Sequence, residues 1–228
     1  MVTTAIILAG GLGTRLKKVV PDLPKPMALI RERPFLEYQM DFWISQGVTK
    51  FILSVGYLNH MIIDHFGDSY HTASIDYFVE DEPLGTGGAL LIAAQGLKET
   101  FLVLNGDTFF EVDLNDLCLF HNKHNAEWTM SLFRSKDLDR YMGVDLEYNG
   151  EILSLQPGGN ELTLLANGGV YLVNPSALKR LNYKPYTKSS LENDLLPKFI
   201  SLGVGLYGFE SSGKFIDIGV PEDYYLAQ

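Results

Sequence analysis

Apolar runs alternate with amphipathic segments along the first half of the chain. The runs at 3–8, 50–55, 75–79 and 100–107 have the length of buried strands. The segments at 34–46, 59–66 and 88–97 have helical periodicity, and Gly47 and Gly67 stand where C-terminal caps belong. Strands and helices that alternate at this spacing predict an α/β, doubly wound, Rossmann-like fold: a mostly parallel sheet with helices on both faces.

The pattern changes after residue 125. It predicts short strands, a helix and a final helix that begins at Pro221, because proline suits a first helical position. The expected strands are 127–133, 143–147, 151–155, 164–173, 203–208 and 214–216, and the expected helix is 189–201. We expect extra antiparallel strands over one side of the sheet. No segment has the composition of a linker, so the chain is interpreted as one domain, 1–228, with lobes at 1–125 and 126–228.

The composition and the net charge limit the classes of binding partner that we expect. The 228 residues are 46% apolar and 20% charged, and the formal net charge is −10. This negative balance argues against nucleic acid or an anionic membrane as a partner. The single cysteine, Cys118, cannot form an internal disulfide and indicates a reducing compartment. No signal peptide and no apolar run of about 20 residues is recognisable, so we expect a cytoplasmic protein.

The first strand ends in a glycine-rich loop, LAGGLGTRL, at residues 8–16. Glycines let backbone N–H groups converge on an anion, and ligands of open α/β sheets lie beyond the carboxyl ends of the strands. The loop is not a dinucleotide fingerprint, because Leu16 occupies the place of the last glycine. The chain also lacks a P-loop, since Gly213-Lys214 is followed by Phe215. We therefore expect a phosphate-binding loop of another kind.

Basic residues gather around this loop. Residues 1–31 hold five cations and one acid in a chain that is acidic as a whole, which predicts a small polyanionic ligand. For Lys17 and Lys18, solvation of the loop is the simpler alternative. Lys25 stands between Pro24 and Pro26, so its backbone is stiff and its charge is held at little entropic cost. Such a lysine suits charge stabilisation in a transition state, and a rigid turn is the alternative.

The motifs LAGGLGTRL and PKPM, with EPLGTGGAL (82–90), VLNGDTFF (103–110), NGGVYLV (167–173) and FIDIGVPEDY (215–224), resemble the signature of the sugar-1-phosphate nucleotidyltransferases. Within this family the chain is most similar to the short guanylyltransferases that act on D-glycero-α-D-manno-heptose 1-phosphate. Mannose-1-phosphate guanylyltransferases and N-acetylmuramate-1-phosphate uridylyltransferases are near neighbours. The resemblance implies a nucleotide-binding lobe at 1–125 and a sugar-binding lobe at 126–228.

The implied reaction is attack of a sugar-1-phosphate oxygen on the α-phosphate of a nucleoside triphosphate. The nucleophile is already an anion, so catalysis consists mainly of positioning and charge neutralisation. The expected catalytic residues are Arg15, which clamps phosphates, Lys25 and Asp107. Asp107 and Asp217 are the expected Mg²⁺ ligands, because Mg²⁺ prefers carboxylate and phosphate oxygens. A helix-cap or turn function is the alternative for each aspartate.

The nucleoside is expected between the glycine loop and the segment after the third strand. Guanine presents two adjacent donors, and Glu80 is favoured as their acceptor over Asp81 and Glu82; solvated charges at the strand end are the alternative. The expected nucleotide-binding residues are Leu8, Ala9, Gly10, Gly11, Gly13, Thr14, Arg15, Glu80, Pro83, Leu84, Gly85, Thr86, Gly87 and Asp107.

For the sugar, the resemblance points to Gly143, Asn167, Gly168, Gly169 and Glu192. A helix cap formed by Ser189 or Ser190 with Glu192 is an equal alternative. The chain departs from the family where many relatives carry a Glu-Lys pair that holds the sugar phosphate. Here the residues at about that place are Gln156-Pro157-Gly158, which leaves open which residue contacts the sugar phosphate. Lys188, Lys179 and Lys214 are candidates, and Lys214 is favoured by its place near Asp217.

The first hypothesis is transfer of GMP from GTP to D-glycero-α-D-manno-heptose 1-phosphate, which yields GDP-heptose and pyrophosphate with Mg²⁺ as cofactor. The alternatives are mannose 1-phosphate as acceptor, or a uridylyl- or thymidylyltransferase that acts on another sugar 1-phosphate. A non-enzymatic sensor or regulatory subunit would lack one of the charged residues Arg15, Lys25, Asp107 or Asp217, and all four are present. A homodimer is left open.

Overall fold

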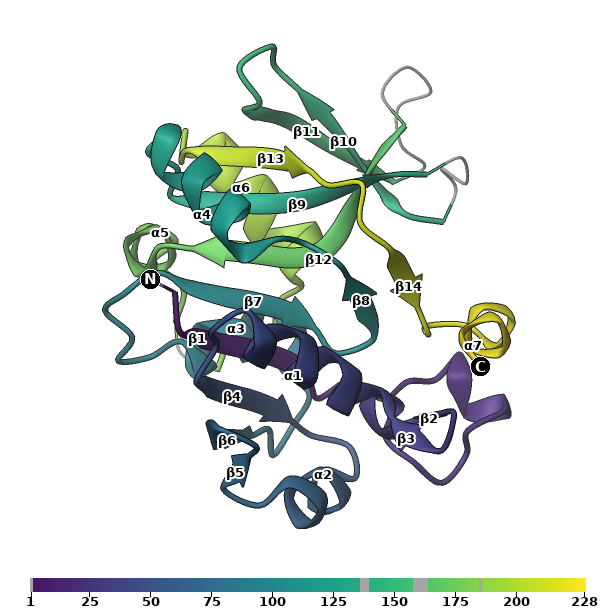
Figure 1. The fold of residues 1–228 in the computed structure, drawn as a ribbon. Helices are drawn as coiled ribbons and strands as arrows, with labels where there is room; N and C mark the ends of the chain where they lie inside the picture. The colour runs from purple at the N-terminus through teal and green to yellow at the C-terminus, as the bar shows by residue number, and fades with distance from the viewer. Residues whose placement is uncertain (1, 136–139, 158–163, 185) are drawn as a thin grey trace.

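In the computed structural model, which describes residues 2–135, 140–157, 164–184 and 186–228, a ten-stranded sheet runs through the molecule (Figure 1). The strand order is β11-β10-β12-β7-β1-β4-β6-β5, with β9 paired to β12 and β13 paired to β9. Four central strands are parallel: β1 (Thr4–Ala9), β4 (Lys50–Val55), β6 (Ala73–Val79) and β7 (Phe101–Asn105). The parallel, doubly wound core predicted from the sequence is thus confirmed.

The strand order reverses at β1. From β1 the chain winds outward through β4 to β6 and then returns to pair β7 with the other edge of β1. Ligands of open α/β sheets bind where the order reverses, outside the carboxyl ends of the strands. The topology therefore places a binding crevice between the loops that follow β1 and β7.

The second half of the chain extends the sheet with mainly antiparallel strands, as the sequence predicts. β12 (Leu165–Val173) runs antiparallel to β7, β9 and β10, while β13 is parallel to β9. The other strands of this half are β9 (Trp128–Arg134), β10 (Met142–Leu146), β11 (Ile152–Pro157) and β13 (Leu206–Glu210).

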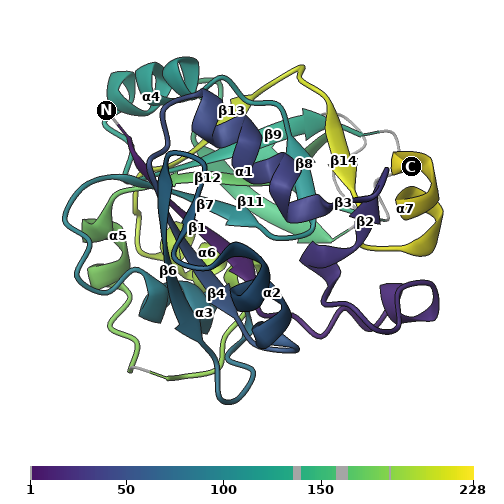
Figure 2. The same cartoon turned by 60° about the horizontal axis from the view of Figure 1, so that its bottom comes forward.

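Helices cover both faces of the sheet because alternate residues of each central strand point to opposite sides. Ala5 and Ile7 of β1 pack in one buried cluster with α1 (Phe35–Ser45), α2 (Asn59–Phe66) and α4 (Leu114–Lys123). Ile6 packs in the other with α3 (Gly85–Ala93), α5 (Pro175–Arg180) and α6 (Leu196–Ser201). Figure 2 shows α1 and α4 on one side of the sheet and α3 on the other.

Two helices were not predicted, α4 and α5. The signal for α4 is short: Asp113 caps it by accepting a hydrogen bond from the Asp116 N–H at 2.9 Å, and Leu114, Leu117 and His121 form its buried face. The helix expected at 189–201 begins as a π-helical turn, η3 (Leu191–Leu195), and continues as α6.

Two short two-stranded sheets and the last helix form one end of the molecule. The strands β8 (Thr108–Phe110) and β14 (Phe215–Asp217) pair with each other, as do β2 (Leu29–Ile30) and β3 (Arg33–Pro34). The last helix, α7 (Pro221–Ala227), begins at the predicted proline and lies beside β2, where the Tyr224 hydroxyl donates to the Leu29 carbonyl at 2.8 Å. The remaining elements are β5 (Ser69–Tyr70) and the 3₁₀ turns η1 (Leu16–Lys18) and η2 (Lys25–Met27). Within the described ranges, every helix is too short or too polar to cross a bilayer.

Candidate active site

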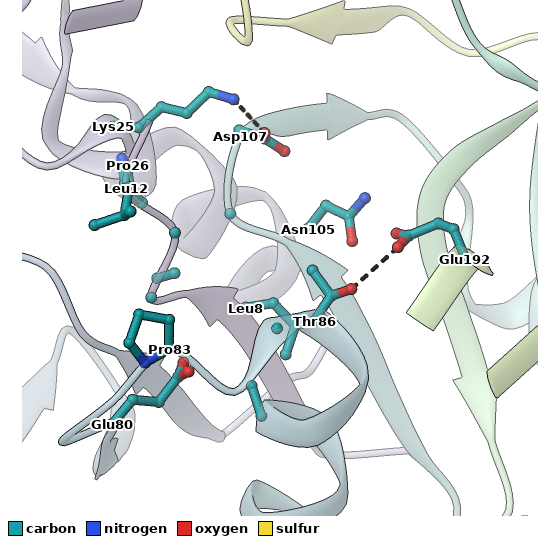
Figure 3. Close-up of a pocket in the computed structure, with 16 residues that line it drawn as sticks. Leu8, Leu12, Lys25, Pro26, Glu80, Pro83, Thr86, Asn105, Asp107 and Glu192 are labelled. Atoms are coloured by element: carbon teal, nitrogen blue, oxygen red, sulfur yellow. Dashed lines mark hydrogen bonds and ion pairs between the residues drawn. The ribbon is translucent and has the colours of Figure 1, made fainter. Parts of the chain in front are cut away.

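A cavity of about 290 Å³ opens at the carboxyl ends of β1 and β7, where the strand order reverses. Its walls come from the glycine loop, the stiff lysine segment, the start of α3, the end of β7 and the turn η3. The lining residues are Leu8, Ala9, Gly10, Gly11, Leu12, Lys25, Pro26, Glu80, Pro83, Gly85, Thr86, Ala89, Asn105, Gly106, Asp107 and Glu192. Figure 3 shows the charged side chains around this space.

The ends of β1 and β7 meet directly. Leu8 and Asn105 lie opposite each other in the parallel ladder, and the Gly106 N–H donates to the Leu8 carbonyl at 3.0 Å. Asp107 follows at once and projects beside the glycine loop. The aspartate and the loop, which are about a hundred residues apart in sequence, are therefore held together by backbone pairing.

Lys25 forms an ion pair with Asp107 across the mouth of the cavity (Figure 3). The lysine begins η2, whose turn is closed by the Ala28 N–H, which donates to the Lys25 carbonyl at 3.0 Å. Pro26 and Met27 are buried beneath it, and the Lys25 side chain is only 12% exposed. The prolines thus fix a nearly buried ammonium group next to the carboxylate, as the sequence suggests.

Asp217 reaches the same place from the far end of the chain. β14 pairs with β8 so that Asp217 lies opposite Thr108, and the Ile218 N–H donates to the Asp107 carbonyl at 3.0 Å. The Asp217 carboxylate accepts hydrogen bonds from the Gly219 N–H and, at 3.1 Å, from Nη2 of Arg140. Arg140 also pairs with Asp223.

Asp107 and Asp217 are suitable ligands for a divalent cation. Each carboxylate lies beside a cationic side chain, so the protein already stabilises positive charge at both positions. Among the described residues, no group of three or more His, Cys, Asp or Glu side chains could hold a metal ion. Two carboxylates with no further protein ligand fit Mg²⁺, which commonly completes its coordination with phosphate oxygens and water.

Glu80 lies at the opposite end of the cavity from Asp107, beneath Pro83 (Figure 3). Its Oε2 accepts a hydrogen bond from the Leu84 N–H at 2.9 Å, and its Oε1 accepts one from the Ser54 hydroxyl at 3.2 Å. Asp81 and Glu82 are exposed. Of the three acids, Glu80 is thus the one fixed at the cavity, and its carboxylate has lone pairs left for a ligand.

Glu192 both lines the cavity and belongs to a helix start. Its Oε2 accepts hydrogen bonds from the Thr86 hydroxyl at 3.0 Å and from the Ser190 hydroxyl at 3.2 Å. Ser190 caps η3 by accepting a bond from the Asn193 N–H at 3.1 Å. The two interpretations of this segment, sugar contact and helix cap, are therefore compatible.

Comparisons with known proteins fit this geometry. A family model described as nucleotidyl transferase matches residues 4–228. The chain belongs to this nucleotidyl transferase family. A D-glycero-α-D-manno-heptose 1-phosphate guanylyltransferase of Aneurinibacillus thermoaerophilus is 42% identical, with 98% of this chain and 96% of the relative covered. A protein of the same name from Campylobacter jejuni is 39% identical, with 97% and 96% covered.

The chain is also similar to a solved structure. The crystal structure of HddC from Yersinia pseudotuberculosis is 36% identical to this nucleotidyl transferase, with a TM-score of 0.85 over 99% of this chain and 97% of that one. A second structure of HddC, complexed with GMP-PN, has a TM-score of 0.84 over the same shares. The Rossmann-like fold class predicted from the sequence is thereby confirmed.

Some expected site residues of this nucleotidyl transferase lie outside the cavity wall. Thr14 and Arg15 are exposed farther along the glycine loop, and within the described part of the chain no hydrogen bond or ion pair holds the Arg15 side chain. Gly13 lies against the Lys25 side chain, and Leu84 and Gly87 are buried at the start of α3. Lys17 lies 4.0 Å from the ring centroid of Tyr57, which supports a structural function for this lysine.

Of the expected sugar-binding residues, Asn167, Gly168 and Gly169 form the part of β12 behind Asn105 and Thr108. Gly143 of β10 pairs with Ala166 of β12. The structure does not bring Lys214 to Asp217: Lys214 is exposed, and its N–H donates to Glu111 at 3.1 Å. Arg140 lies beside Asp217 instead. Gly158 lies outside the described residues.

Several residues at the site were missed in the sequence. Leu12, Pro26, Ala89, Asn105 and Gly106 line the cavity, and Arg140 lies beside it. Asn105 and Gly106 stand within the VLNGDTFF motif, so their place next to Asp107 was a usable signal. Arg140 carried no such signal, because only the fold brings it to Asp217.

Proposed function

We propose that this protein transfers GMP from GTP to D-glycero-α-D-manno-heptose 1-phosphate and so forms GDP-heptose and pyrophosphate. Two relatives that carry this activity in their names match at 42% and 39% identity over nearly their whole length. The structural neighbour HddC, 36% identical, was solved with GMP-PN. The single observation in this chain that carries the proposal is the convergence of Lys25, Asp107 and Asp217 at the mouth of the cavity.

The reaction needs charge neutralisation more than proton transfer. An anionic oxygen of the sugar phosphate forms a bond to the α-phosphorus of GTP, and the bond from that phosphorus to the bridging oxygen of the β-phosphate breaks. Pyrophosphate leaves with the electron pair, so no general base is required. Lys25 is fixed where it can neutralise the charge that develops on these phosphates.

Asp107 and Asp217 would hold Mg²⁺. When bound, the ion neutralises charge on the phosphate oxygens. Arg140, which pairs with Asp217, would place a second cation beside the incoming sugar phosphate. Arg15 would reach the outer phosphates from the exposed rim of the glycine loop.

Specificity would come from the two ends of the cavity. Glu80 would accept hydrogen bonds from N1–H and N2–H₂ of guanine, which uracil, thymine and cytosine do not offer as an adjacent pair. Glu192 would accept a hydroxyl of the sugar at the other end. The backbone around Leu8, Ala9 and Gly10 would contact the base or ribose.

The test is pyrophosphate release measured for GTP, ATP, UTP, CTP and dTTP, each with several sugar 1-phosphates and with added Mg²⁺. We expect the highest kcat/KM for GTP with the heptose 1-phosphate. A higher value with mannose 1-phosphate would favour the second candidate, since a mannose-1-phosphate guanyltransferase of Schizosaccharomyces pombe is 33% identical over 96% of this chain. Turnover with UTP or CTP but not with GTP would contradict the base assignment.

A further inference from the structure

Asn105 ends β7 inside the cavity wall and carries an unused hydrogen-bond acceptor. Its backbone carbonyl accepts a hydrogen bond from Nε2 of Gln39 at 2.8 Å, which fixes the residue in place. Its side-chain oxygen Oδ1 is buried and, among the described residues, has no hydrogen-bond partner. A buried acceptor without a partner is unfavourable, so such an atom next to a cavity indicates a donor on the ligand.

The other end of the Asn105 amide lies against a buried polar residue. Tyr171, which is fully buried beside it, accepts a hydrogen bond from Nδ2 of Asn167 at 2.7 Å. Burial raises the pKa of Tyr171, which keeps its hydroxyl neutral. Gly169 packs so closely that a Cβ there would lie 2.9 Å from Nδ2 of Asn105. The backbone at Gly169 therefore packs against the nitrogen end of the Asn105 amide.

The side-chain oxygen Oδ1 of Asn105 points toward the side of the cavity formed by Thr86 and Glu192 (Figure 3). The Thr86 hydroxyl has used its one donor on Glu192, and it accepts the Leu191 N–H at 2.8 Å. Within the described chain, Oε1 of Glu192 receives no hydrogen bond. Two free acceptors, Oδ1 of Asn105 and Oε1 of Glu192, thus face a ligand that must supply donors.

These acceptors lie at the sugar end of the cavity. Lys25 and Asp107 mark the phosphates, and Glu80 with Pro83 lies at the other end, away from Asn105 and Glu192 (Figure 3). A polyhydroxylated ring offers several hydrogen-bond donors and no charge, so it suits these acceptors. A guanine base would instead meet Glu80.

We propose that Asn105 is a specificity-determining residue for the sugar 1-phosphate, with Oδ1 accepting a hydrogen bond from one ring hydroxyl while Glu192 accepts another. The proposal rests on the proposed function and adds to it which side chain distinguishes sugars.

The test compares wild type, Asn105→Leu and the matched control Asn122→Leu, an exposed asparagine on α4. For each protein, kcat/KM is measured with the parent sugar 1-phosphate and with deoxy analogues that each lack one ring hydroxyl. In wild type and control, we expect loss of the recognised hydroxyl to lower kcat/KM by about 10–100-fold. In Asn105→Leu this penalty should shrink to a few-fold for one analogue only, and the affinity for GTP should stay close to that of wild type.

Unchanged penalties for all analogues in Asn105→Leu would overturn the Asn105 assignment alone, and so would an equal loss of GTP affinity. If wild type releases no pyrophosphate with any sugar 1-phosphate, the proposed function fails and the assignment falls with it. Thermal melting reports folding of the variants. Should Asn105→Leu be unfolded, Asn105→Ser serves instead, because its hydroxyl is too short to reach the ring.

Discussion

The ammonium group of Lys25 and the carboxylate of Asp107 form an ion pair although the two residues are 82 positions apart in the chain. Replacing Lys25 by alanine should lower kcat by about 10²–10³-fold, because one fixed charge is lost where the phosphates react. The KM for GTP should change much less. Steady-state pyrophosphate release checks this, with Lys18→Ala, an exposed lysine of the neighbouring turn, as the control. A variant that loses stability but keeps its rate would support the rigid-turn interpretation.

Asp107→Asn and Asp217→Asn should each reduce turnover by orders of magnitude while the fold is retained. Because both carboxylates would hold one ion, the double variant should be little worse than either single variant. Activity measured against Mg²⁺ concentration should show a higher requirement in each single variant. Effects that multiply, or activity within a few-fold of wild type, would contradict a shared metal.

Gly219 leaves room for both charged partners at the mouth of the cavity. A Cβ at this position would lie 2.6 Å from Oδ1 of Asp217 and 3.2 Å from Nζ of Lys25. Gly219→Ala should therefore displace these side chains and lower kcat by roughly tenfold or more, since misplacement by about 1 Å costs up to 10²-fold. Gly203→Ala is a control for an open position, where a Cβ meets nothing within 4 Å, although its positive φ predicts some loss of stability.

Glu80→Gln should raise the KM for GTP by about 10–100-fold, because an amide offers guanine one acceptor in place of a carboxylate. The amide oxygen can still accept the Leu84 N–H, so the loop should keep its shape. Steady-state kinetics in which one substrate is varied while the other is held saturating separate the effect on GTP from the effect on the sugar 1-phosphate. Asp81→Asn, an exposed neighbour, is the matched control, and an equal effect in both variants would argue against Glu80 as the base contact.

Because His121 is buried, we expect the stability of the folded protein, rather than the rate of the reaction, to depend on the protonation of this residue. It is 5% exposed between α4 and β9, and burial lowers its pKa from 6.5 to about 4. The folded state thus keeps the neutral ring, and stability is lost as pH falls below 6.5, where the unfolded chain takes up the proton. Between pH 7 and pH 5 the loss from this residue should be about 2 kcal/mol. Urea unfolding of His121→Gln should show a flatter profile over that range, and an identical slope would contradict this explanation.

The sequence predicted the elements that have a recognisable pattern within a short stretch of residues. These elements include the strands β1, β4 and β7, the cap glycines and the stiff Lys25 segment. The helix α4 was missed because its buried face consists of only three side chains, one of which is a histidine. The division into two lobes at residue 125 and the open question of a homodimer stay predictions.

Only part of the site could be predicted from the sequence, because contacts of the folded chain decide which charged side chains lie next to one another. Asp107 and Asp217 were recognised as candidates, yet only the β8–β14 pairing explains how they meet. Lys214 was favoured for its closeness in sequence to Asp217, whereas Arg140 occupies that place in space. The number of residues between the partners gave no information on which side chains form the Lys25–Asp107 and Arg140–Asp217 ion pairs.

The pairing of β14 with β8 also has a consequence for how the protein is made. Asp107 leaves the ribosome with the parallel core, whereas Asp217 follows on the order of ten seconds later at about 5–20 residues per second. Until then the nascent chain lacks the second carboxylate. A nascent chain that ends before Asp217 should therefore be unable to hold the metal ion of the proposed reaction.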